Sequence, residues 1–231
     1  MVYSQPEELS VPVSVDLHYL LQAPDPLPEN PLLVLVTHGY GMQPSLMLGL
    51  ARQVLPSQAI IASLEAPNQH YLSEKPGSDQ IGFNWGTRAR WRGAVSTHQQ
   101  MLLSVIEQCR QKYRVPGKHT LLLGFSQPVG LNYRFAATCP DEIGGVIGIC
   151  GGVPKDWEDE GYQPVSAALL HIARNQDEYY PVETVKTFAG RLRHRASDVE
   201  FHLLEGPHRF PSKAGAIVQP WLRRVFPKAA L

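Results

Sequence analysis

The sequence contains few cysteines, no excess charge of either sign and no long hydrophobic run. Its 231 residues include three cysteines, an odd number with no close pair, so we expect neither a disulfide framework nor a cysteine-based zinc site. The 21 lysines and arginines equal the 21 aspartates and glutamates, whereas nucleic-acid-binding proteins usually carry a basic excess. The longest aliphatic run, residues 32–36, is too short to cross a bilayer. We therefore expect no nucleic-acid partner, no membrane span and no metal.

The first residues lack the pattern of a secretory leader. Residues 1–10 contain neither a basic segment nor an apolar segment of the kind that directs export, so we expect a cytoplasmic protein. Because α/β folds of this length are often undivided, we expect one domain over residues 1–231. A chain of this size can bury a core large enough to need no disulfide. The sequence leaves the oligomeric state open.

Short apolar runs alternate with stretches of helical periodicity along most of the chain. Residues 32–36 are apolar throughout, which is typical of a strand buried on both faces of a parallel sheet. Strands that alternate with helices predict a mostly parallel central sheet with helices on both faces, an α/β fold. The expected strands are 11–21, 32–36, 59–64, 120–125, 143–149, 167–173 and 199–204, and the expected helices are 94–113, 127–138, 182–195 and 213–226.

Two long loops, residues 65–92 and 151–164, interrupt this alternation. Loops beyond about 12–15 residues in a compact domain are usually functional or disordered, and loops at the carboxyl ends of the strands line the ligand crevice of an open α/β sheet. We expect these two to form a partial cap, with Trp85, Trp91 and Trp157 lining the substrate crevice. The alternative is that these tryptophans anchor their loops to the core.

The strongest chemical signal is the segment GFSQ at residues 124–127, between an expected strand and an expected helix. On such a sharp turn the Oγ of Ser126 is held out of the sheet, where it can act as a nucleophile. The backbone N–H of Gln127, at the helix N-terminus, then points to the place where an oxyanion would form. A loop serine or a helix cap is the alternative interpretation of Ser126.

Two further residues could complete a nucleophilic site. Asp177 and His208 each follow the carboxyl end of an expected strand, on the edge of the sheet that carries Ser126. The chain order serine, aspartate, histidine is the one that α/β-hydrolase folds use, although either residue could simply belong to a turn. The glycine-rich loop 37–41 follows the buried strand and could present the backbone N–H of Tyr40 as a second oxyanion donor.

These segments together resemble the α/β-hydrolase superfamily, and within it the phospholipase/carboxylesterase family, which includes acyl-protein thioesterases. The resemblance implies an α/β-hydrolase fold and cleavage of small ester or thioester substrates without a cofactor. It also implies catalytic roles for Ser126, Asp177 and His208, and oxyanion donation by the N–H groups of Tyr40 and Gln127. The matching segments are LVTHGYG at 35–41, GFSQ at 124–127, DEYYP at 177–181 and GPH at 206–208.

One position departs from the pattern of the family. Pro128 stands where the family usually has glycine after GFSQ. A proline restricts the backbone of the preceding residue, which here is Gln127, although proline itself is tolerated in the first turn of a helix. Two alternatives therefore stay open beside an esterase. One is a weakly active or non-catalytic binding protein on a hydrolase fold, and the other is a lactonase or peptidase of the same fold.

Overall fold

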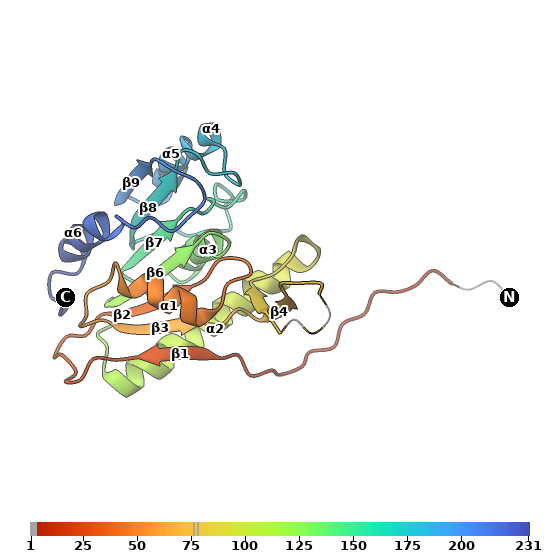
Figure 1. The fold of residues 1–231 in the computed structure, drawn as a ribbon, viewed down its shortest axis with the longest axis horizontal. Helices are drawn as coiled ribbons and strands as arrows, with labels where there is room; N and C mark the ends of the chain where they lie inside the picture. Colours follow the sequence, from red (N-terminus) through yellow and green to blue (C-terminus); the bar gives the residue numbers. More distant parts are fainter. Residues whose placement is uncertain (1–3, 76, 78) are drawn as a thin grey trace.

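The computed structural model describes residues 4–75, 77 and 79–231, and its central feature is a seven-stranded sheet (Figure 1). The strand order is β1-β3-β2-β6-β7-β8-β9; β1 pairs antiparallel with β3, and the other neighbours are parallel. The strands are β1 (Tyr19–Gln22), β2 (Leu33–Thr37), β3 (Ile60–Leu64), β6 (Thr120–Phe125), β7 (Gly145–Ile149), β8 (Ala168–Arg174) and β9 (Val199–Leu204). The prediction of a mostly parallel α/β sheet is confirmed.

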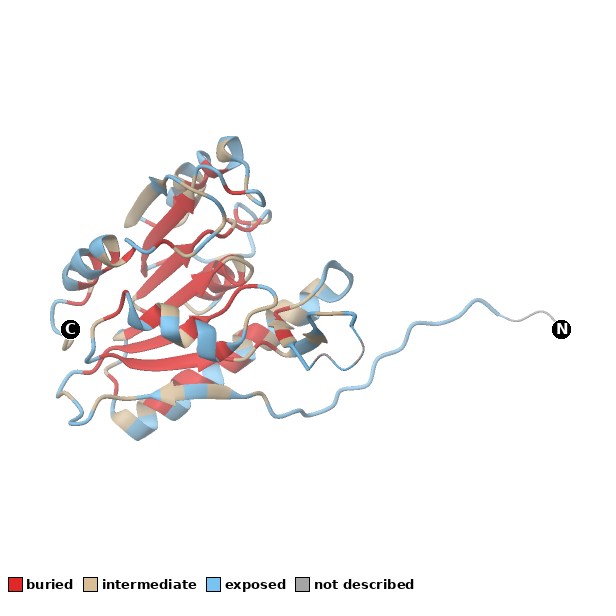
Figure 2. Cartoon of the chain, in the orientation of Figure 1, coloured by how far each residue is buried: buried red, intermediate tan, exposed pale blue. Residues whose placement is uncertain are grey.

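Helices cover both faces of the sheet, so that its central strands are buried along their whole length (Figure 2). One face packs on α2 (Trp91–Tyr113), α3 (Val129–Thr138) and α5 (Phe188–Arg193), and the other packs on α1 (Pro44–Arg52) and α6 (Gly215–Val225). A short helix, α4 (Val182–Val185), precedes α5. Burial on both faces explains why the central strands read as continuous apolar runs in the sequence.

The structure corrects three expectations about the elements. The strand expected over residues 11–21 is confined to β1, because among the described residues no strand pairs with residues 11–17, and Val11, Val13 and Val15 are exposed. The helix expected over 182–195 is two helices, α4 and α5, separated by Lys186 and Thr187. Helix α1, which begins at a proline suited to the first helical turn, was not predicted.

The segment 65–92, expected to be a loop, contains its own secondary structure. Strands β4 (Asn68–Tyr71) and β5 (Ile81–Asn84) form an antiparallel pair, and the 3₁₀ turn Arg88–Arg90 leads into α2. Phe83 of β5 accepts a hydrogen bond from the N–H of Gly41 (2.8 Å) and donates one to the carbonyl of Met42 (3.2 Å). The segment thus packs against the glycine-rich loop that follows β2.

Candidate active site

Ser126 lies on the sharp turn between β6 and α3. Its φ angle is +64°, in the left-handed region that non-glycine residues rarely adopt, and its N–H donates to the carbonyl of Ile149 (2.8 Å). The turn needs a glycine at position 124, because a Cβ there would lie 2.6 Å from the Asn132 side chain. The local fold therefore holds the Oγ of Ser126 beyond the sheet edge, as the sequence predicted for a strand-to-helix turn.

The structure brings Ser126, His208 and Asp177 together from three separate segments. The Nε2 of His208 lies 2.8 Å from the Oγ of Ser126, and its Nδ1 lies 2.6 Å from the Oδ2 of Asp177. The side chains of His208 and Asp177 are 9% and 1% exposed, so this hydrogen-bond chain is shielded from water. A histidine held in this way can take a proton from a serine hydroxyl while the carboxylate fixes its tautomer.

Neighbouring groups hold the hydrogen bonds between Ser126, His208 and Asp177 in place, and burial disfavours the thiolate of the nearby Cys150. The second oxygen of Asp177, Oδ1, accepts the backbone N–H groups of Tyr179 (2.8 Å) and Tyr180 (3.0 Å), which fixes the orientation of the carboxylate. The exposed carboxylate of Glu178 accepts the backbone N–H of His208 (3.0 Å), and this bond lowers the pKa of Glu178. Burial raises the pKa of the nearby Cys150 thiol to about 12, so Cys150 stays protonated at neutral pH.

The two residues predicted to supply oxyanion donors, Tyr40 and Gln127, belong to the same cavity as Ser126. Tyr40 and Gln127 line the same cavity as Ser126 and His208, and within residues 4–75, 77 and 79–231 neither N–H has a hydrogen-bond acceptor. The Tyr40 N–H shares its peptide plane with the carbonyl of Gly39, which lies 2.8 Å from the Nδ1 of His38. Because the Nε2 of His38 accepts the N–H of Ala66 (3.1 Å), Nδ1 carries the proton and donates to Gly39.

Pro128 fits the turn without removing a donor. It has φ −78° and ψ −7°, helical values that a proline adopts readily, and it stands just before the first residue of α3. Its carbonyl accepts the N–H of Asn132 (2.8 Å). Pro128 therefore does not disturb the start of α3 at Val129. The backbone N–H of Gln127, the predicted oxyanion donor, is retained.

A cavity of about 470 Å³ opens at the Oγ of Ser126. Aromatic side chains dominate its wall, and among the described residues that line it there is no lysine, arginine, aspartate or glutamate. Its lining residues are Gly39, Tyr40, Met42, Trp91, Phe125, Ser126, Gln127, Tyr179, Tyr180 and His208.

Of the three tryptophans expected at the crevice, Trp91 lies in the cavity wall and the other two do not. Trp85 and Trp157 are 0% exposed, and their indole N–H groups donate to the carbonyls of His38 (2.8 Å) and Arg191 (2.9 Å). Both anchor their loops to the core, which was the alternative interpretation. Tyr179, Tyr180, Met42 and Phe125 were not predicted as lining residues, although each stands close in sequence to a predicted site residue.

The loop 151–164 is bound to the body of the domain by its acidic residues. Asp156 pairs with Arg134 of α3, and Glu158 pairs with Arg191 of α5 at 2.7 Å. None of the described residues of this loop lines the cavity at Ser126. The contribution of segment 65–92 to that cavity is Trp91, at the start of α2.

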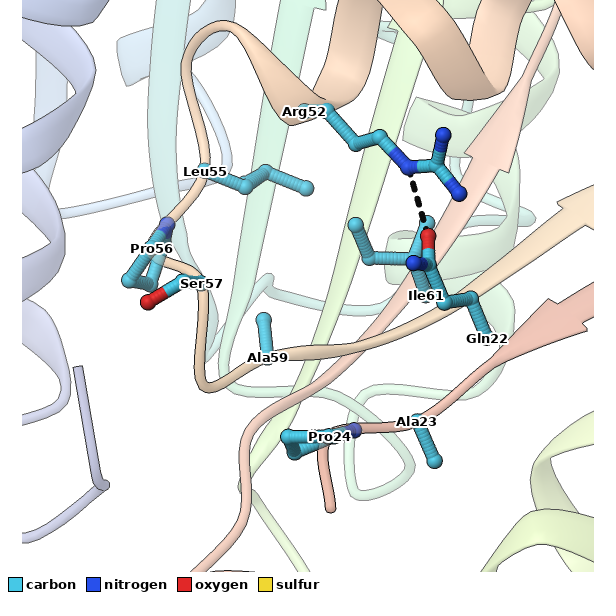
Figure 3. A pocket seen from close by; sticks show the side chains of 9 residues that line it. All are labelled: Gln22, Ala23, Pro24, Arg52, Leu55, Pro56, Ser57, Ala59 and Ile61. Carbon is cyan, nitrogen blue, oxygen red and sulfur yellow. Dashed lines mark hydrogen bonds between the residues drawn. The ribbon is translucent and has the colours of Figure 1, made fainter.

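A second cavity lies at the opposite end of the sheet, beside the end of β1 and the start of β3 (Figure 3). It has a volume of about 310 Å³, and within it the Nε of Arg52 donates to the Oε1 of Gln22 (2.5 Å). None of its described lining residues is a histidine or a carboxylate, so it offers no base for a nucleophile. The cavity at Ser126 is therefore the better candidate site.

Membrane-spanning and metal-binding features were searched over the described residues. In that part of the chain no helix combines the length and the apolar character that a bilayer span requires. Within the same residues, no group of three or more His, Cys, Asp or Glu side chains is arranged to hold a metal ion.

The sheet, the covering helices and the serine on its strand-to-helix turn define an α/β-hydrolase fold. Solved structures share this fold. The Bacillus cereus carboxylesterase is 16% identical over 91% of this chain and 95% of that chain, with a TM-score of 0.68. A Mesorhizobium loti carboxylesterase is 18% identical over 89% of this chain and 94% of that chain, with a TM-score of 0.69. Esterase PE8 is 20% identical over 92% of this chain and 100% of that chain, with a TM-score of 0.71. A comparison with the curated proteins finds no sequence match. Residues 23–225 match the model of the phospholipase/carboxylesterase family, and the chain belongs to that family.

Proposed function

We propose that the protein is a serine hydrolase that cleaves carboxylic esters or thioesters of small acyl substrates. The observation that carries this proposal is the 2.8 Å contact between the Nε2 of His208 and the Oγ of Ser126 at the floor of an open cavity. A serine hydroxyl is a weak nucleophile unless a base accepts its proton, and His208 is placed to do so. Membership of the phospholipase/carboxylesterase family supports the same chemistry.

In the proposed reaction, His208 accepts the proton of Ser126 while the Oγ attacks the acyl carbon. Asp177 holds the Nδ1–H of His208 and stabilises the imidazolium that forms. The N–H groups of Tyr40 and Gln127 stabilise the negative oxygen of the tetrahedral intermediate. The protonated His208 returns its proton to the departing alcohol or thiol, and water then repeats the sequence on the acyl-enzyme.

The cavity favours uncharged substrates. Its wall is formed largely by Tyr40, Trp91, Phe125, Tyr179 and Tyr180, and no lysine, arginine or carboxylate lines it among the described residues. Burying an unpaired charge against such a wall is costly, whereas aromatic side chains contribute a large apolar contact area. Acetyl, butyryl and benzoyl esters therefore suit the cavity better than an ester with a free carboxylate.

The proposal is tested with p-nitrophenyl acetate, butyrate, benzoate and hemisuccinate. We expect turnover of the three neutral esters, a much lower kcat/KM for the charged hemisuccinate, and loss of all turnover in Ser126→Ala. Turnover that persists in Ser126→Ala contradicts the assignment of the nucleophile. Absence of turnover and of acylation across the panel in the wild-type protein contradicts the enzyme and favours the binding-protein alternative.

A further inference from the structure

Trp85 is a buried residue that contacts both halves of the proposed oxyanion site. Its indole N–H donates to the carbonyl of His38 (2.8 Å), in the loop that carries Tyr40. Its backbone N–H donates to the side-chain Oε1 of Gln127 (2.9 Å), the residue after Ser126. Tyr40, in the loop after β2, and Ser126, in the turn after β6, are 86 residues apart in the sequence. Trp85 joins the two segments through two hydrogen bonds.

The carboxamide of Gln127 makes a second bond to the same segment. Its Nε2 donates to the carbonyl of Gly86 (3.0 Å), so that the amide bridges consecutive backbone groups of residues 85 and 86. Gly86 has φ +148°, and a Cβ at this position would lie 2.4 Å from the Cβ of Ala94. The chain therefore needs a glycine here to present the carbonyl to Gln127.

The other end of this connection fixes the peptide that carries the Tyr40 N–H. The carbonyls of His38 and Gly39 are held in succession, the first by the Trp85 indole and the second by the ring of His38. With both carbonyls held, the peptide that carries the Tyr40 N–H is fixed in orientation beside the cavity that Tyr40 lines. The Trp85 ring is also enclosed, with the ring centroids of His38 and His98 at 5.5 and 5.1 Å.

We propose that Trp85 and the carboxamide of Gln127 act together as a positioning element that holds the N–H groups of Tyr40 and Gln127 at the distance an oxyanion requires. Neither group touches the substrate in this role: Trp85 is 0% exposed, and the carboxamide is bonded to backbone. The proposal depends on the proposed function of Ser126.

Two single variants separate the hydrogen bonds from packing. Gln127→Met keeps a side chain of similar size and the backbone N–H, but it removes both bonds to residues 85 and 86. Trp85→Phe keeps an aromatic ring and the backbone bond to Gln127, but it removes the bond to His38. Trp221→Phe is the matched control, because Trp221 is 2% exposed, lies on the other face of the sheet, and its indole nitrogen has no partner among the described residues.

The measurements are the rate constant for acylation by p-nitrophenyl acetate and the dissociation constant of this ester, both from the dependence of the p-nitrophenolate burst rate on ester concentration, and the inhibition constant of phenylboronic acid. Boronic acids form an anionic tetrahedral adduct with a serine, so their affinity reports the oxyanion site. Removal of a whole oxyanion donor costs about 10²–10³ in rate. For each of the two single variants we therefore expect acylation about 10–100-fold slower, a boronate inhibition constant raised by a similar factor, and a dissociation constant of the ester within about threefold of the wild-type value.

The double variant tests whether the two residues act as one element. If they do, Gln127→Met combined with Trp85→Phe is slowed little more than the slower single variant, since groups that act as a unit are strongly non-additive. Trp221→Phe keeps the wild-type acylation rate and boronate affinity. Thermal melting of every variant shows that each is folded at the assay temperature.

The outcomes distinguish this proposal from the proposed function. If Gln127→Met and Trp85→Phe keep wild-type acylation and boronate affinity while turnover still depends on Ser126, the positioning role is wrong and the proposed esterase function is unaffected. Slowing shared equally with Trp221→Phe also overturns the positioning role, because it then reflects general loosening of the core. A wild-type protein that neither reacts with the ester nor binds the boronate overturns both proposals.

Discussion

Asp177 and His208 meet through a 2.6 Å contact between Oδ2 and Nδ1. The other carboxylate oxygen, Oδ1, accepts two backbone N–H groups, so the carboxylate cannot rotate away from the imidazole. In the proposed reaction, Asp177 therefore orients His208 and also stabilises the positive charge that His208 acquires. The two residues come from the ends of neighbouring strands, β8 and β9, whose pairing sets the distance between them.

The first prediction concerns this contact. Asp177→Asn has nearly the same shape, but it removes the negative charge and lets an amide face the Nδ1 of His208, which favours the wrong tautomer. We expect kcat to fall by about 10³–10⁴, with little change in the melting temperature. Steady-state kinetics on p-nitrophenyl acetate measures it, with Asp198→Asn, which alters a surface pair with Arg224, as the control. A loss below tenfold would contradict the role given to Asp177.

The second prediction follows from the backbone strain at Ser126. At ordinary positions glycine is less stable than alanine by about 0.5–1 kcal/mol, but a left-handed non-glycine residue costs about 1–2 kcal/mol. With φ +64° at this position, we expect Ser126→Gly to be more stable than Ser126→Ala by about 0.5–1 kcal/mol, and both to be inactive. Urea unfolding of the two variants decides it; alanine more stable than glycine would show that the turn is unstrained.

The third prediction concerns Pro128. Because its φ of −78° suits proline and the N–H of Gln127 is retained, we expect Pro128→Gly to change kcat/KM by less than about threefold. The free energy of unfolding should fall by about 0.4–1 kcal/mol, since glycine leaves the unfolded chain more freedom. Kinetics and urea unfolding on the same preparation measure both. A tenfold gain in activity would instead mean that the proline misdirects the oxyanion donor.

The fourth prediction concerns acid stability. Burial lowers the pKa of His98 to about 3 in the folded protein, against about 6.5 in the unfolded chain. The unfolded state therefore binds more protons below pH 6.5, and the stability contributed by neutral His98 is lost as the pH falls from about 6.5 toward 3. Between pH 7 and pH 5 this loss is about 2 kcal/mol.

His98→Leu removes that titration. Between pH 7 and pH 5, we expect the free energy of unfolding of this variant to decrease by about 2 kcal/mol less than that of the wild-type protein. His171 is also fully buried, and burial lowers its pKa to about 3, so the His98→Leu variant keeps a second histidine of the same kind and part of the pH dependence persists. Denaturant titrations at the two pH values measure the difference, and an identical decrease in both proteins would contradict the prediction.

The sequence predicted the parts of the fold that local pattern determines. The central strands were recognisable because burial on both faces makes them continuously apolar, as in β2 and β6. The amphipathic α2 was predicted from residue 94, three residues after its start at Trp91. Residues 11–18 alternate like a strand, but a strand also needs a neighbouring strand to pair with. The alternation in the sequence cannot show whether such a neighbour exists. The break between α4 and α5 likewise leaves no clear trace in the periodicity.

The sequence could predict that Ser126, Asp177 and His208 lie near one another because each follows a strand, and the carboxyl ends of parallel strands meet at one edge of the sheet. The role of the tryptophans could not. Trp85, Trp91 and Trp157 all stand in segments that the sequence predicted as long loops, and only the packing of those segments decides which ring faces the cavity. Trp85 in particular lies in the core because its two N–H groups find acceptors on loops distant in the sequence.

The most direct test of the account is covalent labelling with a fluorophosphonate, which reacts with serines activated as nucleophiles. Intact mass spectrometry followed by peptide mapping identifies the modified residue. We predict one adduct per chain, located on Ser126, with labelling much slower in His208→Ala and absent in Ser126→Ala. No adduct in the folded wild-type protein, or an adduct on a different residue, would contradict the assignment of Ser126 as the nucleophile.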